Sequence, residues 1–135
     1  MAFLPYIHFN GTCAEAMTFY CSLFHGTDLQ MMKYSDMPVE EGGAPSDRIL
    51  HSQFTAAGEV LMASDTPPGM DDSPQQGVSI MIEPATLTES QRLFDALADG
   101  GAVIIPMSPT SWSPGFGMIK DRFDTHWIIG TQPAP

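Results

Sequence analysis

Thr12-Cys-Ala-Glu15 and Thr86-Leu-Thr-Glu89 decide the fold, because each predicts the start of a helix and they lie 74 positions apart. In each stretch the threonine hydroxyl is placed to accept from a first-turn N–H group while the glutamate reaches back, which is a capping box. A helical stripe follows each box, and a glycine, Gly26 or Gly100, then stands where a left-handed C-cap is expected. The stripes are Ala16, Phe19, Tyr20, Leu23, Phe24 and Ser90, Leu93, Phe94, Leu97, Ala98. Both segments thus share a capping box, a helical pattern of mainly apolar residues and a terminal glycine, and this agreement predicts an internal repeat.

Strand-like segments surround both helices in the same order. One precedes each helix, at 3–9 and at 78–83. Three follow the first helix, at 28–34, 48–56 and 59–64, and three follow the second, at 102–106, 116–120 and 125–129. Ala57-Gly58 is expected to close a tight hairpin. The sequence therefore predicts an α+β fold, a single domain of two βαβββ modules with cupped mixed sheets, at about 1–70 and 76–135, joined by a linker at about 65–76.

One helix covers only one face of a four-stranded sheet, so the other face needs a partner. We expect that partner to be the repeat, in the same chain or in a second copy. Two curved sheets set together leave a concavity, which is where a ligand is expected.

Composition excludes several classes of function. The chain has 135 residues, of which 43% are hydrophobic, and 5 Lys and Arg stand against 16 Asp and Glu, for a net charge of −11. Such a surface repels a phosphate backbone, so no nucleic-acid partner is expected, whereas a cationic or neutral partner is allowed. No apolar run is long enough to cross a bilayer and no signal peptide is recognised, so we expect a cytoplasmic protein without membrane contact.

Short motifs along the whole chain resemble one known family. The opening Pro5-Tyr-Ile-His-Phe-Asn-Gly11, followed by Ala14-Glu-Ala16 and Phe19-Tyr20, resembles the PhnB-like branch of the vicinal-oxygen-chelate superfamily, the glyoxalase/bleomycin-resistance/dioxygenase fold. Further matches are Leu61-Met-Ala-Ser-Asp65, Leu93-Phe-Asp-Ala-Leu97, Trp112 with Gly115-Phe-Gly117, and Asp121-Arg-Phe with Trp127-Ile. The resemblance implies paired βαβββ modules, a homodimer and a pocket inside each cupped sheet. Asp124 stands where that branch usually has a glycine, and aspartate tolerates a left-handed turn.

The resemblance also implies where a metal would bind. Enzymes of the superfamily place His or Glu ligands on the first and last strands of each module, and counting from the helices puts those positions near Pro5, Met62, Val78 and Ile128. None of these side chains binds a divalent ion, so no metal or other cofactor is predicted. A divalent metal remains the alternative if the register is in error, through His8, Asp65 or His126. By strand parity His126 shares the face of Ile128, whereas His8 has the opposite parity to Pro5 and is expected outside the cup.

Three polar residues are candidates for the pocket. His126 is the best single candidate, and it lies beside Trp127 on the closing strand. His51 is a second candidate, although a structural role is favoured about two to one. Asp65 is a third, although an aspartate at the end of a strand is more often a turn former.

Three apolar candidates complete the set. Trp112 and Phe116 flank Pro114-Gly115 in a loop, which indicates a binding lip, and a hydrophobic plug or a dimer contact is an equally good interpretation. Met62 on a strand would give the pocket an adaptable wall, and core filling explains it equally well.

Two functions from different classes follow. The first is a small-molecule-binding protein without a tightly bound metal, for which a cationic ligand would suit the charge of −11. The alternative is a metal-dependent lyase, isomerase, dioxygenase or thiol transferase of the same superfamily, with a cation held by His126, Asp65 and another oxygen ligand. The sequence supplies no catalytic residue, and it does not decide whether the modules pair within one chain or are exchanged between two.

Overall fold

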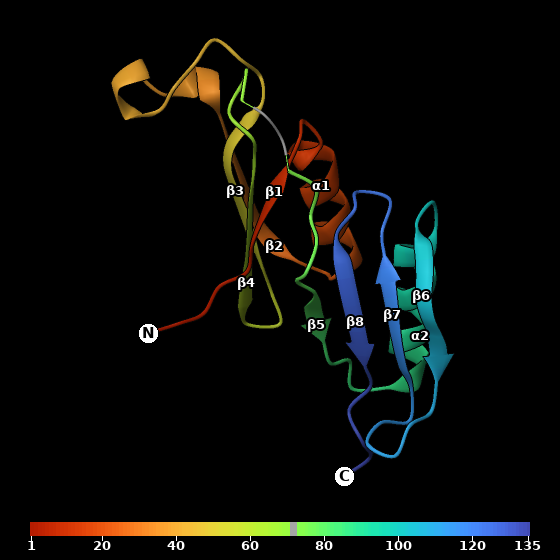
Figure 1. The fold of residues 1–135 in the computed structure, drawn as a ribbon. Coiled ribbons are helices and arrows are strands. Elements are labelled where there is room, and N and C mark those ends of the chain that lie inside the picture. Colours follow the sequence, from red (N-terminus) through yellow and green to blue (C-terminus); the bar gives the residue numbers. More distant parts are fainter. Residues whose placement is uncertain (71–72) are drawn as a thin grey trace. The chain divides into compact units, whose positions relative to one another are not determined.

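The computed structural model describes residues 1–70 and 73–135, and the chain divides into two compact units, Met1–Ser73 and Pro74–Pro135. Each unit holds one α-helix and one four-stranded mixed sheet (Figure 1). The order β-α-β-β-β occurs in both, as the repeat predicts, and the α+β fold class is confirmed.

In the first unit the chain runs through β1 (Tyr6–Phe9), α1 (Cys13–Leu23), β2 (Thr27–Lys33), β3 (Ile49–Ala56) and β4 (Glu59–Asp65). Two short 3₁₀ helices, η1 (Tyr34–Asp36) and η2 (Val39–Glu41), lie between β2 and β3. The sheet order is β1-β4-β3-β2. Strand β1 is parallel to β4 and the other neighbours are antiparallel, so the first and last strands of the unit lie side by side.

The second unit repeats this arrangement with β5 (Ile80–Ile82), α2 (Leu87–Ala98), β6 (Ala102–Ser108), β7 (Phe116–Lys120) and β8 (His126–Gly130). Its sheet order, β5-β8-β7-β6, is the same as that of the first unit, again with a single parallel pair between the first and last strands. Equal order and equal direction in both sheets confirm the repeat from the topology as well as from the sequence.

The helix of each unit packs on one face of its own sheet, and the core lies between them. In the first unit Ile7, Phe9 and Phe54 of the sheet are buried, as are Met17 and Tyr20 of α1. In the second unit Trp127 and Ile129 of β8 and Ile119 of β7 are buried with Phe94 and Leu97 of α2. Burial of these apolar side chains supplies the main driving force for each unit.

The two helices begin differently, which corrects the prediction of two equal capping boxes. The Thr86 hydroxyl accepts from the Glu89 N–H at 3.2 Å, as expected. Thr12 makes no side-chain capping bond to α1. A carboxylate oxygen of Asp65 accepts from the Cys13 N–H at 3.0 Å instead. An anion supplied by β4 therefore satisfies the first turn of α1 in place of the local hydroxyl.

The helix ends also differ from one another. Gly100 has φ +75 and takes the left-handed conformation that was predicted for it. After α1 the left-handed residue is His25, with φ +53, and not Gly26. A Cβ on Gly26 would lie 2.7 Å from the Phe54 ring, so this glycine is required for a close approach and not for its φ.

Two predicted turns have the expected geometry. Ala57 and Gly58 have φ of +51 and +77 between the paired residues Ala56 and Glu59, as in a type I′ hairpin. Asp124 has φ +70 in the turn before β8, so the aspartate adopts the left-handed conformation itself.

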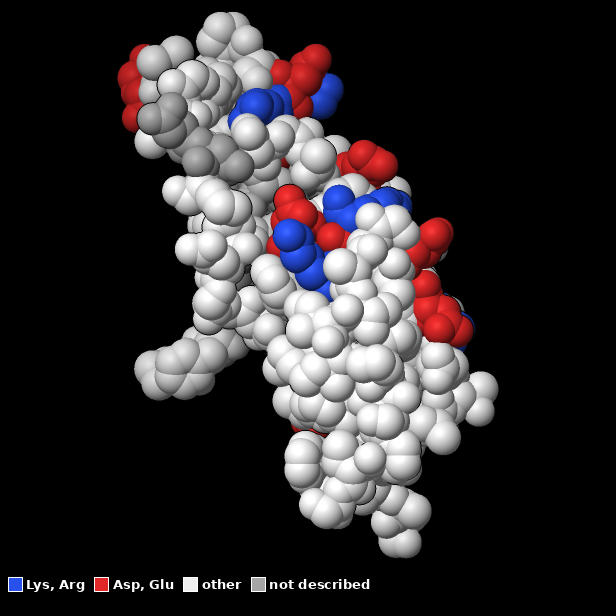
Figure 2. All heavy atoms as spheres, turned by 45° about the vertical axis from the view of Figure 1, so that its right-hand side comes forward, with Lys and Arg blue, Asp and Glu red and all other residues white. Residues whose placement is uncertain are grey.

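Charged side chains gather in small mixed groups on the surface that Figure 2 shows. The ion pairs Lys33–Asp47, Arg92–Glu89 and Lys120–Asp124 join neighbouring charges of opposite sign. Among the described residues, the helices are too short or too polar to traverse a lipid bilayer.

Candidate functional site

The sheet of the first unit has a second face, opposite α1, which we call the first helix-free face. Strand β1 alternates between the two faces, because Ile7 and Phe9 are buried whereas Tyr6 and His8 are exposed. Register then assigns the neighbouring strands: Tyr6 pairs with Met62 and His8 with Ser64, and Met62 pairs with Gln53. The first helix-free face thus carries Tyr6, His8, His51, Gln53, Met62 and Ser64, together with Gln30 and Met32 of β2.

This register corrects the prediction for the first strands. Pro5 and Val78 precede β1 and β5, and the positions on the helix-free side are Tyr6, His8 and, in the second unit, Met81. His8 therefore lies on the same face as Met62, not outside it. Counting back from the helix starts gave a shift of one residue in β1 and of three in β5, because a helix start does not fix the length of the loop that precedes it. A shift by an odd number of residues exchanges the faces of a strand.

A chain of hydrogen bonds crosses the first helix-free face. The Tyr6 hydroxyl lies 2.9 Å from Nδ1 of His51, and Nε2 of His51 lies 2.9 Å from Oε1 of Gln53. Because an amide oxygen only accepts, Nε2 carries a proton, and in the neutral imidazole Nδ1 then accepts from the phenol. The two bonds thus select the Nε2–H tautomer of the neutral ring, between neighbours from β1 and from its own strand.

A second pair of polar groups lies beside this chain. Ser64 Oγ is 3.3 Å from Nδ1 of His8, and the His8 ring is 5.3 Å from the Tyr6 ring, centroid to centroid. The Tyr6 ring is also 5.6 Å from the His51 ring. Three rings and a serine hydroxyl thus gather on one surface, and Met62 adds a flexible apolar contact between the strands.

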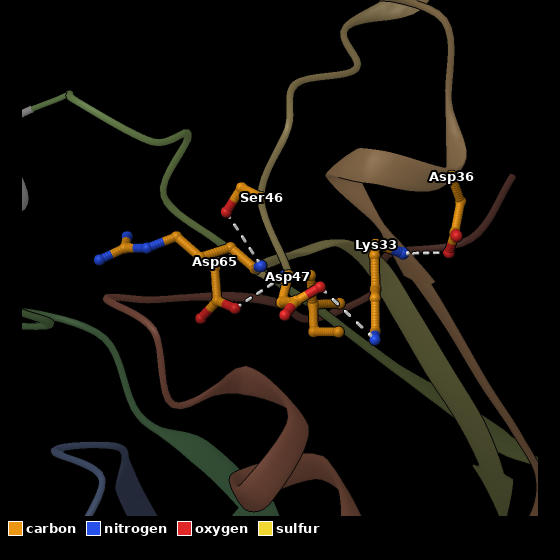
Figure 3. A network of polar contacts seen from close by, with 7 residues as sticks. Lys33, Asp36, Ser46, Asp47 and Asp65 are labelled. Atoms are coloured by element: carbon orange, nitrogen blue, oxygen red, sulfur yellow. Dashed lines mark hydrogen bonds and ion pairs between the residues drawn. The ribbon is translucent and has the colours of Figure 1, made fainter.

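Asp65, which the sequence placed among the pocket candidates, lies on the other face. It is 2% exposed and its register partner is the buried Phe9. One carboxylate oxygen accepts from the N–H groups of Gly11 and Cys13, at 2.8 and 3.0 Å. The other accepts from the N–H of Ile49 at 2.8 Å, the bond of Asp65 that Figure 3 shows. The structure gives Asp65 the role of a turn and cap former, and the expectation that it lines the pocket is corrected.

The same carboxylate acts on two buried neighbours. Burial first, and the negative charge of Asp65 second, raise the pKa of the Cys13 thiol to about 12. The Tyr34 hydroxyl donates to the backbone oxygen of Asp65 at 2.8 Å, and burial followed by the Asp65 charge raises the pKa of this phenol as well. Both groups stay protonated at neutral pH, so neither serves as a nucleophile or base.

The helix-free face of the second unit, the second helix-free face, is apolar. Met81, Ile128 and Met118 are register partners across three strands, and Ile105 pairs with Met118. A Cβ on Gly130 would lie 2.8 Å from the Met81 methyl and 3.8 Å from the Phe116 ring, so the end of this face is closely packed.

The remaining candidates belong to this second unit. His126 shares the face of Ile128, as its parity predicts, and its Nδ1 is buried without a hydrogen-bond partner. Phe116 pairs with Gly130 at the other end of β8. The Trp112 ring lies 5.7 Å from the Phe116 ring, edge to face, and Trp112 is 63% exposed in the β6–β7 loop. Of the six candidates, His51 and Met62 lie together on the first helix-free face, and His126 and Phe116 lie on the second.

Sequence reasoning missed Tyr6, Gln53 and Ser64. The signal for Tyr6 and Gln53 is the two-residue alternation in Tyr6-Ile7-His8-Phe9 and in His51-Ser52-Gln53-Phe54, whereas Ser64 is found only through its register with His8. Read as strands with one buried face, both segments place these polar groups on one surface.

The residues present do not fit a divalent metal. Among the described residues, no group of three or more His, Cys, Asp or Glu side chains is placed to hold an ion. The paired positions of the first and last strands are Tyr6 with Met62, and Met81 with Ile128. A phenol, two thioethers and an alkyl chain are not the oxygen and imidazole donors that such ions select.

Comparisons with known proteins agree with the fold described above. Residues 1–130 match the family model described as 3-demethylubiquinone-9 3-methyltransferase. The crystal structure of protein PA1353 from Pseudomonas aeruginosa is 36% identical, with a TM-score of 0.88 and 98% of each chain covered. A putative 3-demethylubiquinone-9 3-methyltransferase, PhnB protein, from Bacillus cereus is 24% identical, with a TM-score of 0.77 and coverage of 97% of this chain and 99% of that one.

A more distant structure relates the fold to a wider group. The glyoxylase/bleomycin resistance protein/dioxygenase domain from Frankia sp. EAN1pec has a TM-score of 0.62 at 12% identity, over 98% of this chain and 92% of that one. At this identity the likeness shows the fold alone, and it confirms the βαβββ repeat of the glyoxalase/bleomycin-resistance type. The match over residues 1–130 shows more: the chain belongs to the PhnB-like family whose model is described as 3-demethylubiquinone-9 3-methyltransferase.

Proposed function

We propose that this protein binds an organic small molecule on the first helix-free face and does so without a resident divalent metal. The observation that carries the proposal is the hydrogen-bond chain of Tyr6, His51 and Gln53, with links of 2.9 Å, on the sheet face that no helix of its own unit covers. Polar groups fixed by one another on an accessible surface present hydrogen-bonding positions at little further cost in side-chain entropy.

The chemistry of this face indicates what kind of ligand it suits. The rings of Tyr6, His8 and His51 offer stacking surfaces, and Met62 offers an adaptable apolar contact. The face defined above includes no lysine or arginine, and the chain carries a net charge of −11. A planar neutral or cationic molecule is therefore favoured over an anion.

The relatives support a small-molecule role without naming a ligand for this chain. The Frankia structure is described as a glyoxylase/bleomycin resistance protein/dioxygenase domain, a description that refers to small molecules. The family description names a methyltransferase, but no G-x-G-x-x-G segment follows a predicted strand, so the proposal does not include methyl transfer.

The test is binding to the purified protein. Thermal shift against a panel of planar neutral, cationic and anionic compounds should give hits among the first two classes, with affinities then measured by calorimetry. His51→Asn should weaken those hits at least tenfold, whereas His25→Asn at the exposed end of α1 should not change them. Asparagine also tolerates the φ of +53 at position 25, which makes it a matched control. Equal binding by both variants would remove the first helix-free face as the site.

The metal-dependent alternative has its own test. The protein is dialysed, its metal content is measured, and thermal shifts are recorded with nickel, zinc, manganese and iron. We expect no stoichiometric metal and no shift. A stoichiometric metal that His126→Ala abolishes would favour the lyase, isomerase, dioxygenase or thiol-transferase alternative instead.

Three more expectations accompany the proposal. We propose a homodimer, because the second helix-free face exposes Met81 and Ile105. We also propose a cytoplasmic location and no nucleic-acid partner, and a net charge of −11 supports the second.

A further inference from the structure

We propose that Tyr6, His51 and Gln53 form a proton relay that removes a proton from carbon in a bound carbon acid. The inference rests on the proposed function, because it assigns chemistry to the same helix-free face. It extends that function from binding to catalysis of enolisation, isomerisation or elimination, reactions that begin with loss of a C–H proton.

Three side chains in series have the arrangement that acid–base catalysis requires. An acid–base group must lie within hydrogen-bond reach of a base, and a third group must orient that base. The Tyr6 hydroxyl is 2.9 Å from Nδ1 of His51, and Oε1 of Gln53 is 2.9 Å from Nε2. Gln53 is the positioning residue, because its amide oxygen keeps the proton on Nε2 and leaves the Nδ1 lone pair facing the phenol.

The proposed step moves two protons, and no heavy atom of the protein is transferred. The Tyr6 oxygen takes the proton from the carbon of the substrate while its own proton passes to Nδ1 of His51. The electron pair of the broken C–H bond remains with the substrate, as an enolate or as a new π bond if a leaving group departs. His51 becomes an imidazolium whose Nε2–H bond to Gln53 is strengthened by its charge, and it returns the proton to the product or to water.

The surroundings leave the relay accessible. Tyr6 is 41% exposed, so a substrate can approach its side chain. Among the described residues that the register assigns to this face, the titratable ones are Tyr6, His51 and His8, whose Nδ1 lies by Ser64 Oγ. Strand β2 contributes Met32 opposite His51 and Gln30 opposite Gln53, and neither side chain titrates.

The experiment uses 5-nitrobenzisoxazole, a carbon acid that reports proton removal directly. Loss of its ring C–H proton breaks the N–O bond and releases a coloured nitrophenolate, so the base is the only catalyst required. The purified full chain should open the ring at least tenfold faster than free imidazole at the same concentration. The rate should rise with pH, because the relay needs the uncharged imidazole of His51 as its final base.

Variants separate the relay from simpler explanations. His51→Asn and Tyr6→Phe should each lower kcat at least tenfold, and His51→Asn should also abolish the rise with pH, while Gln53→Ala should lower kcat and weaken that rise. His25→Asn should match the wild type in rate and pH profile. Circular dichroism confirms that each variant is folded. Loss in His51→Asn together with a full rate in Tyr6→Phe would show that His51 acts directly, which overturns the relay.

A wild-type rate equal to that of free imidazole would also overturn the relay. Binding is measured separately by thermal shift with the compounds that bind the wild type. If compounds still bind but proton removal is not catalysed, the relay is rejected and the proposed function stands. If no compound binds in a way that His51→Asn weakens, the site itself is rejected.

Discussion

The carboxylate of Asp65, the last residue of β4, accepts the backbone N–H of Cys13, the first residue of α1, at 3.0 Å. The same side chain accepts from the N–H of Ile49 at the start of β3. One buried anion thus ties together three elements of the first unit that are distant in sequence. Figure 3 shows this carboxylate beside the segment that leads into β3, where Lys33 and Asp47 also pair. In the second unit the buried Asp121 organises a local turn instead, because it accepts from the N–H groups of Phe123 and Thr125 and from the indole of Trp127, all within six residues of it.

Replacing Asp65 should therefore destabilise the first unit without changing its helix-free face. Asp65→Asn keeps the shape but removes the charge and turns an amide N–H group toward a backbone N–H group. We expect a loss of about 2–4 kcal/mol in the free energy of unfolding. Thr12→Ala is the control, because the Thr12 side chain makes no capping bond, and it should cost less than about 0.5 kcal/mol. Urea denaturation measures both, and a larger loss for Thr12→Ala would show that the local cap carries the helix.

The buried thiol of Cys13 should make the protein sensitive to alkali. Its pKa is about 12 in the folded state, compared with about 9.0 for an exposed thiol. Above about pH 9 the unfolded chain loses this proton while the folded chain retains it, so stability is full below pH 9 and falls as pH rises toward 12. The expected slope is up to about 1.4 kcal/mol per pH unit from this group. Melting temperatures measured from pH 8 to 11 should fall less steeply in Cys13→Ala.

Much of the fold was predictable because local signals agree over each unit. The strands at 116–120 and 59–64, the hairpin at Ala57-Gly58 and the second capping box all depend on neighbours in sequence, and the structure has them. The first capping box was wrong, because the Thr12 side chain makes no capping bond and Asp65, about fifty residues away, accepts the N–H of Cys13 in the first turn of α1 instead. No local pattern reports such a competitor.

The candidate site was predictable only in part, because a strand face depends on register. Met62 and Ile128 on the last strands were placed on the correct faces, but the first strands were shifted by an odd number of residues, which moved His8 to the wrong side. The partnership of Tyr6 with His51 joins two strands separated by β4, and 45 positions in the chain. Pairing of this kind appears only when the sheet order is known.

The β3–β4 hairpin should accept a stabilising substitution. Ala57 has φ +51, a conformation that costs an alanine about 1 kcal/mol, and Gly58 follows with φ +77. Ala57→Asn produces the Asn-Gly pair that favours a type I′ turn, and we expect a gain of about 0.5–1 kcal/mol by urea denaturation. Ala57→Val is the matched opposite, since a β-branched residue resists positive φ, and it should lower stability. A loss with asparagine would mean that the alanine is not strained in this turn.

The second helix-free face provides the test of assembly. Met81 is 51% exposed and lies beside Ile128 and Met118, so its apolar surface would remain in water unless another sheet covers it. Light scattering should give the mass of two chains for the wild type at micromolar concentration. Met81→Glu places a charge among these apolar side chains and should shift the protein toward the monomer, because burying an unpaired carboxylate costs several kcal/mol. Glu59→Gln, on an exposed position at the start of β4, should leave the mass unchanged.

A wild type that stays monomeric contradicts the homodimer. Persistence of the dimer in Met81→Glu, with the folded state confirmed by circular dichroism, would instead mean that the two chains meet through a different surface.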